Sequence, residues 1–198
     1  MVKYLNRDRK DGEPLRKMRL VMNNELNKGG HLSSQPMGAL FNYVEEDPAT
    51  GQERVLNFPV RKDCLYKTDV EELARLLEGH KPELIIFGKS MFLHKEPVEF
   101  VHNIVKDWEP RPVIMYDMAH VLGLYGILQE PFKEGADVIT GSTHKTFFGP
   151  QRGVIASTIS KESPLSHLWV DIKSRAFPGS TSNHHLGTLL ALLMAAYE

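Results

Sequence analysis

Four short apolar runs constrain the fold of this 198-residue chain more than any other feature. They are residues 83–88, 112–117, 136–141 and 153–157. The intervening segments include 69–79 and 96–108, whose apolar residues recur at helical spacing. Strands without polar alternation are buried on both faces, and amphipathic helices supply the cover. We therefore predict an α/β fold, with a mainly parallel sheet and helices on both faces.

Weaker patterns flank this alternating region. Residues 17–22, 39–44 and 55–60 indicate short strands, and the turn residues at 47–51 predict a hairpin-like excursion between the last two. Residues 183–197 carry leucines at helical spacing, which predicts a further helix. We expect residues 1–17, which are highly polar, to form an arm outside the core, and residues 18–198 to form one domain.

Composition excludes several classes of protein. The chain has 24 Lys and Arg against 25 Asp and Glu, a net charge of −1, which argues against a nucleic-acid-binding surface. One cysteine, Cys64, excludes an internal disulfide framework and fits a reducing compartment. No apolar run approaches the ~20 residues of a membrane helix, and the first residues lack the apolar core of a secretory signal. We expect a cytoplasmic protein with no membrane or nucleic-acid partner.

Chemically reactive residues follow three of the apolar runs. Lys89 and Ser90 follow the first run, Asp117 ends the second, and Lys145 stands four residues after the third. Because ligands of open α/β sheets bind at the carboxyl ends of the strands, we expect these side chains to converge on one edge.

A lysine and an aspartate at neighbouring strand ends suit one cofactor in particular. A partly desolvated lysine can form a Schiff base with an aldehyde, and an aspartate can hold a protonated pyridine nitrogen. Pyridoxal phosphate enzymes use this combination. The alternatives are a solvated surface lysine at Lys145 and a turn residue at Asp117, because most lysines stay in water.

Other chemistries find less support in the residues. Gly88-Lys89-Ser90 resembles the end of a phosphate-binding loop, but Glu83 stands where that motif needs its first glycine. No histidine pair has the zinc-binding H-E-x-x-H spacing, and His184 and His185 are adjacent, so we predict no metal site. Cys64 lies in no nucleophile motif, and no G-x-S-x-G turn is present.

Three strings occur in one order and at suitable separations. They are Gly29-Gly30-His31-Leu32-Ser33, Asp117-Met118-Ala119-His120-Val121 with Gly123-Leu124, and Thr143-His144-Lys145-Thr146 with Gly149-Pro150. Together with Phe177-Pro178-Gly179, they closely resemble serine hydroxymethyltransferase, a fold-type I pyridoxal phosphate enzyme, and its archaeal-type or divergent members most of all. The resemblance covers residues 18–198 and implies part of the large domain of such a transferase.

The resemblance implies roles around the cofactor ring. Lys145 would form the Schiff base, and Asp117 would pair with the pyridine nitrogen. His31 would stack on one face of the ring, and the small side chain of Ala119 would pack on the other. His120 would sit near the phenolic oxygen.

The resemblance also implies roles for residues farther from the ring nitrogen. Ser90, like His120, would sit near the phenolic oxygen of the ring, although the string around Ser90 departs from the usual family pattern. Ser142, Thr143 and His144 would line the site around the lysine, and Thr143 and His144 would steer proton transfers. Gly179 and Ser180 would approach the cofactor phosphate, in this family usually that of the neighbouring subunit.

For the whole protein, the resemblance implies reversible transfer of the serine one-carbon unit to a reduced pterin, tetrahydrofolate or an analogue, yielding glycine. Two alternatives stay open: a threonine-type aldolase or transaldolase on the same scaffold, and a non-catalytic fragment. Family members carry a Gly/Ser-rich phosphate loop and a substrate-clamping arginine that find no counterpart here. We therefore expect the isolated chain to be inactive, and we expect a homodimer or a higher homo-oligomer.

Overall fold

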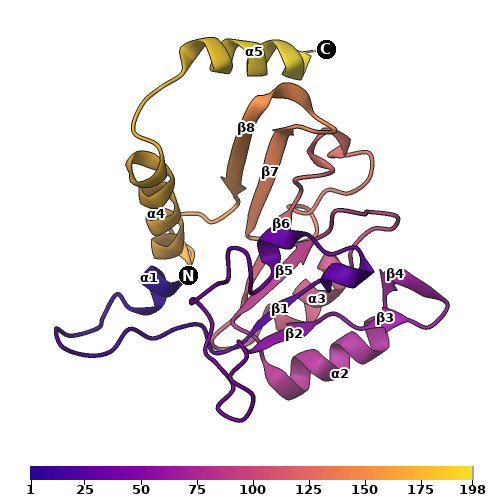
Figure 1. Cartoon of the computed structure of the whole chain (residues 1–198), viewed down its shortest axis with the longest axis vertical. Helices are drawn as coiled ribbons and strands as arrows, with labels where there is room; N and C mark the ends of the chain where they lie inside the picture. The colour runs from indigo at the N-terminus through magenta and orange to yellow at the C-terminus, as the bar shows by residue number, and fades with distance from the viewer. Residues whose placement is uncertain (198) are drawn as a thin grey trace.

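The computed structural model describes residues 1–197 and is built around a six-stranded sheet with the order β2-β1-β5-β6-β7-β8 (Figure 1). The strands are β1 (Val21–Asn23), β2 (Val55–Asn57), β5 (Leu84–Gly88), β6 (Val113–Asp117), β7 (Val138–His144) and β8 (Phe148–Ser157). All neighbours pair in parallel except β7 and β8, which form an antiparallel pair. The prediction of a mainly parallel sheet is confirmed.

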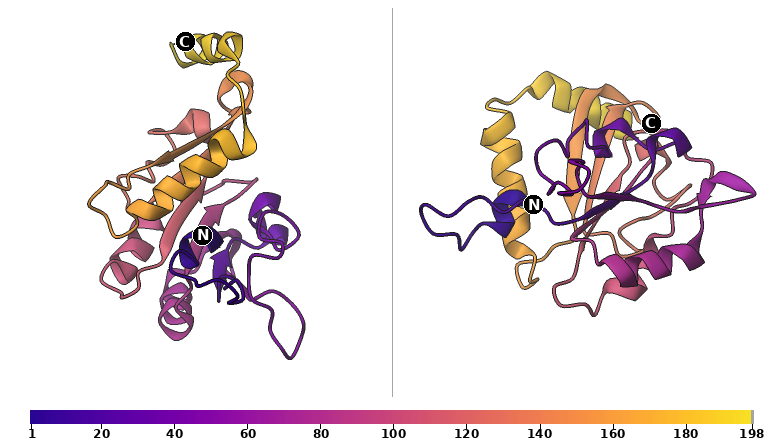
Figure 2. Two further views of the ribbon diagram at one scale, coloured as in Figure 1. Left: turned by 90° about the vertical axis from the view of Figure 1, so that its left-hand side faces the viewer. Right: turned by 60° about the horizontal axis from the view of Figure 1, so that its bottom comes forward.

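Successive residues of the buried strands point to opposite faces of the sheet, and each face has its own cover. Ile85 and Phe87 of β5 belong to a core cluster with leucines of α2 (Val70–His80) and valines of α3 (Val98–Val105). Leu84 and Ile86 belong to a second cluster with Leu168 of α4 (Ser166–Ser174). Each fully buried side chain of this kind contributes about 1.5–3 kcal/mol. Helices therefore cover both faces, as predicted, and α4 lies beside the sheet (Figure 2).

The helices begin and end where the sequence offers caps. Asp69 caps α2, since its carboxylate accepts a hydrogen bond from the backbone N–H of Glu72 at 3.1 Å. Lys81 ends α2 in the left-handed conformation, with φ 48°. The predicted helix over 96–108 is shorter, because α3 starts after Pro97. The predicted helix at 183–197 is α5 (Leu186–Tyr197).

The region before β5 differs from the prediction. Residues 39–44 are turns rather than a strand, with only Val44 bridged to Met18. The predicted strand over 17–22 is three residues, Val21–Asn23, and the predicted strand over 55–60 is β2, Val55–Asn57, which pairs in parallel with it. The predicted hairpin-like excursion is present around the turn at 47–51, where Glu46 and Glu53 form an antiparallel bridge and Asp47 N–H donates to the Gln52 carbonyl at 2.7 Å. A second hairpin, which was not predicted, joins β3 (Val60–Arg61) to β4 (Cys64–Thr68).

The first residues pack on the domain. Helix α1 (Val2–Leu5) places Met1, Tyr4 and Leu5 against the second core cluster. The Lys3 Nζ atom lies 2.9 Å from Asp171 Oδ1 on α4. Residues 1–17 are therefore attached at their beginning to α4, and the loop that follows α1 projects outward (Figure 1).

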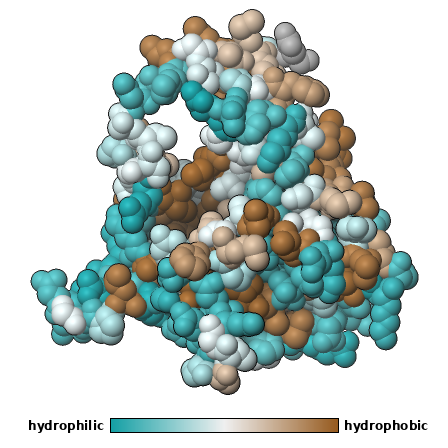
Figure 3. All heavy atoms as spheres, in the orientation of Figure 1, coloured by the Kyte–Doolittle hydropathy of each residue, from teal (hydrophilic) through white to brown (hydrophobic). Residues whose placement is uncertain are grey.

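Helix α5 exposes several large apolar side chains. Leu186, Leu189, Leu190 and Met194 are all more than half exposed. Helix α5 lies at the top of the molecule in Figure 1, where the surface in Figure 3 is largely brown and tan. The helix is held to β8 through contacts that include Leu192 near Gly149 and Thr188 Oγ1 bonded to Arg152.

Candidate active site

The site lies where the chain reverses direction across the sheet. From β1 the chain moves outward to β2 and then returns to β5 on the other side of β1, so β1 and β5 flank a topological switch point. Crevices at such points open at the carboxyl ends of the strands and are the usual ligand sites of α/β folds. His31 follows β1, Lys89 follows β5, Asp117 ends β6, and Lys145 follows β7. The topology therefore brings these four residues to the same edge of the sheet, at the carboxyl ends of the strands, as predicted for Lys89, Asp117 and Lys145.

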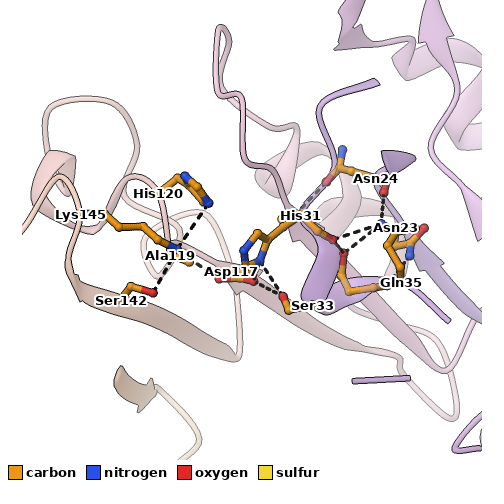
Figure 4. A network of polar contacts seen from close by, with 12 residues as sticks. Asn23, Asn24, His31, Ser33, Gln35, Asp117, Ala119, His120, Ser142 and Lys145 are labelled. Atoms are coloured by element: carbon orange, nitrogen blue, oxygen red, sulfur yellow. Dashed lines mark hydrogen bonds and ion pairs between the residues drawn. The ribbon is translucent and has the colours of Figure 1, made fainter. Parts of the chain in front are cut away.

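Asp117 is the buried acid of this edge and is 5% exposed. Its Oδ1 atom accepts a hydrogen bond from the backbone N–H of Ala119 at 3.0 Å. Its Oδ2 atom lies 2.6 Å from His31 Nδ1 and accepts from Ser33 Oγ at 2.8 Å (Figure 4). Gly88 makes room for it on β5, because a Cβ there would stand 3.0 Å from Asp117 Cβ. Both carboxylate oxygens are thus oriented by neighbours.

His31 reaches Asp117 because two glycines precede it. Gly29 has φ 88°, and a Cβ on Gly30 would stand 2.4 Å from the carbonyl oxygen of Asn24. The His31 N–H then donates to the Gly88 carbonyl at 2.9 Å. The His31 ring meets the His120 ring edge-on, with centroids 5.1 Å apart. His31 therefore contacts the carboxylate through Nδ1, and its stacking on a cofactor ring stays a prediction.

Lys145 lies on the other side of the same edge. Its Nζ atom is 3.4 Å from His120 Nε2 and 3.4 Å from Ser142 Oγ (Figure 4). It lines an open cavity of about 630 Å³ with His120, Gly123, Leu124, Thr146 and Phe148. A primary amine facing a cavity between an imidazole and a hydroxyl can react with a carbonyl compound that enters there.

His120 is held as a neutral base in this arrangement. Burial, and then the positive charge of Lys145, lower the pKa of His120 below its ordinary value, and the opposing influence of Asp117 is smaller. At neutral pH its ring is therefore uncharged, and Nε2 can accept a hydrogen bond from Lys145 Nζ.

The remaining predicted residues lie outside this cluster. Thr143 is buried, and its hydroxyl bonds to the Pro150 and Arg152 carbonyls of β8 at 2.6 and 3.0 Å. His144 and Ser90 are exposed, and the Ser90 N–H donates to the Gly29 carbonyl at 2.8 Å. Gly179 packs on the end of α4, where a Cβ would stand 2.8 Å from the Ser174 carbonyl oxygen, and Ser180 follows it. Their predicted roles stay predictions.

Sequence reasoning did not single out two polar residues of this edge. Ser33 completes the triangle with His31 and Asp117, and its Oγ lies 2.6 Å from His31 Nδ1. Asn24 bonds to the N–H of Gly88 through its side-chain oxygen at 2.8 Å. Ser33 stands within the quoted glycine-histidine string, so its hydroxyl was a usable signal, whereas Asn24 carried none.

Two other kinds of functional feature are absent from residues 1–197. No helix there combines the length and the apolar character needed to cross a bilayer. Nor does that part of the chain bring together three or more histidine, cysteine or acidic side chains in a metal-binding group.

Comparison with known proteins gives a consistent family. The sequence profile described as Serine hydroxymethyltransferase matches residues 15–196. A serine hydroxymethyltransferase of Archaeoglobus fulgidus is 43% identical over 147 residues, which are 73% of this chain and 31% of that protein. One from Thermoplasma acidophilum is 37% identical over 186 residues, which are 90% of this chain and 39% of that protein. The chain thus spans about a third of the length of these relatives.

A solved structure agrees with this result. The L-threonine transaldolase of Pseudomonas fluorescens, crystallised in its internal aldimine state, superposes with a TM-score of 0.68 at 26% identity. The match covers 89% of this chain and 37% of the transaldolase chain. The predicted fold class, part of the large domain of a fold-type I pyridoxal phosphate enzyme, is confirmed.

Proposed function

This chain belongs to the serine hydroxymethyltransferase family, and on that premise we propose that the whole protein transfers the hydroxymethyl carbon of serine to a reduced pterin, yielding glycine. The pterin would be tetrahydrofolate or an analogue, and pyridoxal 5'-phosphate would be the cofactor. The observation that carries the proposal is the convergence of Lys145, Asp117 and two histidines on one sheet edge.

The donor set fits this cofactor. Lys145 would hold its aldehyde carbon, and Asp117 its ring nitrogen. The Asp117 carboxylate already accommodates a heteroaromatic ring nitrogen, that of His31, at 2.6 Å. When bound, the cofactor supplies an electron sink for charge that develops at the α-carbon of an amino acid.

The protein side chains supply orientation and charge. Asp117 provides a buried negative charge, which favours a protonated ring nitrogen. The neutral His120 ring can accept a hydrogen bond from Lys145 Nζ, which orients the amine towards the cavity. Ser142 offers a second hydrogen-bond partner to the same amine at 3.4 Å. Ser90, Thr143, His144, Gly179 and Ser180 complete the proposed set of site residues.

The test is glycine formation from serine by the whole protein, with pyridoxal 5'-phosphate, measured with and without tetrahydrofolate. We expect folate-dependent turnover that Lys145→Ala abolishes. Lys133→Ala is the matched control, because Lys133 is an exposed lysine whose ion pair, with Glu130, lies within its own turn. Absence of glycine formation under all conditions would contradict the proposal. We expect the 198-residue chain alone to be inactive, because it spans only about a third of its relatives.

One observation favours a second candidate. The structural relative is an L-threonine transaldolase, so the same scaffold supports chemistry on threonine. Cleavage of threonine without folate, in the absence of folate-dependent glycine formation from serine, would assign the whole protein to that class.

We also propose that the whole protein is a cytoplasmic homodimer. Its single cysteine, Cys64, is a free thiol, which fits a reducing compartment. Helix α5 presents apolar surface for a second subunit.

A further inference from the structure

The lysine of the Gly88-Lys89-Ser90 string has no place in the proposed chemistry, yet it is one of the most buried side chains of the protein. Lys89 is 2% exposed. Its Nζ atom lies 2.5 Å from Glu96 Oε1, and it donates a hydrogen bond to the Tyr66 carbonyl of β4 at 2.8 Å. The Glu96 side chain is 1% exposed. Burying both charges carries a desolvation cost, so this pair calls for an explanation.

Glu96 connects the ion pair to the strand ends. Its Oε2 atom accepts a hydrogen bond from Asn24 Nδ2 at 2.9 Å. Its Oε1 atom forms the ion pair with Lys89 Nζ, but the two groups are not aligned for a hydrogen bond. No other donor among residues 1–197 bonds to this oxygen. The Glu96 backbone is fixed as well, because Gln129 bonds to its N–H at 3.0 Å and to its carbonyl at 2.7 Å. Glu96 is therefore a rigid acceptor for Asn24 and a counter-ion for Lys89.

Asn24 carries this connection to His31. Its side-chain oxygen accepts from the N–H of Gly88 at 2.8 Å, and its carbonyl accepts from Gln35 Nε2 at 2.8 Å. Gln35 Nε2 also donates to the His31 carbonyl at 3.2 Å (Figure 4). Asn24 thus touches both the end of β5 and the segment that carries His31.

The backbone of Lys89 completes the arrangement. Lys89 forms an isolated antiparallel bridge with Gly30, so that Gly29–His31 is laid across the end of β5. The same residue therefore pairs with the His31 segment through its backbone and with Glu96 through its side chain. A movement of Lys89 would shift His31 relative to Asp117.

We propose that the buried Lys89–Glu96 ion pair, acting through Asn24, is the positioning element that holds His31 against Asp117. An apolar pair of the same volume would fill the space, but it would leave the Tyr66 carbonyl without its donor and Asn24 Nδ2 without its charged acceptor. The importance of this role for catalysis rests on the proposed function, whereas the positioning itself concerns only residues of this chain and is testable without cofactor.

The test compares Lys89→Met, Glu96→Gln and the double variant in the 198-residue chain. Each single variant leaves one buried charge alone and should lower stability, while the double variant removes both charges and keeps the volume, so it should recover much of the stability. Lys133→Met with Glu130→Gln is the control, since that pair is exposed and lies within one turn.

The readout is amide hydrogen exchange at His31 and Ser90, whose N–H groups bond to Gly88 and Gly29. We expect about a tenfold faster exchange at these two amides in the double variant, with the Val113 amide at the opposite end of β6 unchanged. A role confined to stability would accelerate all three amides together or none, and either result would overturn the proposal.

A second measurement separates this inference from the proposed function. In the whole protein, the dissociation constant of pyridoxal 5'-phosphate should rise about tenfold in the double variant and stay constant in the control. If the parent protein fails to bind the cofactor, the proposed function fails, while the exchange result still decides the role of the ion pair. If the cofactor binds the parent and the double variant equally, the pair does not position the site.

Discussion

Gly123 offers the sharpest test of how closely the elements around Lys145 approach each other. A Cβ at this position would stand 2.2 Å from the Thr146 carbonyl oxygen and 2.7 Å from the Phe147 nitrogen. Ordinary contact begins at 3.4 Å, so Gly123→Ala must push the turn after Lys145 away by about 1.2 Å. The obstructing atoms are backbone, which cannot rotate aside. We expect a loss of about 1–3 kcal/mol in the free energy of unfolding.

The displacement should also lower the catalytic rate. A misplacement of about 1 Å in a reacting group costs on the order of 100-fold in rate, so the whole protein should lose turnover by about that factor. Urea unfolding monitored by circular dichroism measures the stability. Gly79→Ala in α2 is the matched control, because nothing lies within 4 Å of its Cβ position, and alanine there should stabilise by up to about 1 kcal/mol. If Gly123→Ala and the parent unfold at the same urea concentration, the close approach of Gly123 to the backbone of Thr146 and Phe147 is refuted.

Three further predictions concern the same edge. Ser33→Ala removes one donor to Asp117 Oδ2, which should lower the free energy of unfolding by about 1–3 kcal/mol, and Ser33→Thr should restore it; equal losses in both urea titrations would contradict the role of the hydroxyl. Folding lowers the pKa of His120 below 6.5, so the unfolded state binds more protons, and the contribution of this group to stability should fall as the pH drops below 6.5 and be constant above it. His120→Gln should flatten that part of the profile of unfolding free energy against pH, and an unchanged slope would refute the assignment. Borohydride reduction of the whole protein with pyridoxal 5'-phosphate, followed by peptide mass spectrometry, should label Lys145, and labelling spread evenly over exposed lysines would count against its special reactivity.

The fold was predictable from sequence where burial alone determines structure. Runs such as 83–88 are apolar because both faces of β5 are covered, so the pattern and the cause coincide. Residues 39–44 misled because their apolar side chains resemble a short strand, whereas Leu40 is buried from within a turn and only Val44 forms a bridge. Strand β4 was missed because Thr68 is the one buried residue among its five, and α4 because its charged and apolar residues are only weakly segregated.

The residues of the site were predictable from sequence, but most contacts between them were not. The residues of the three quoted strings could be placed at strand ends, and the structure brings Asp117, His31, His120 and Lys145 together. Local sequence carries no information on which distant side chains pair. Asn24 and Glu96 are 72 positions apart in the chain and meet only in the folded protein. Contacts of that kind, which set the orientation of the reactive groups, had to come from the structure.

Strand β1 has a consequence for the order of folding. Its three residues pair in parallel on both sides, with Val21 opposite Val55 and also opposite Leu84. Parallel neighbours cannot be joined by a tight turn, so both pairings require long loops to close first. Such non-local pairing slows folding towards the millisecond-to-second range. The segment that carries His31 should therefore join the sheet late, and refolding should restore the contact between His31 and Asp117 in its final phase.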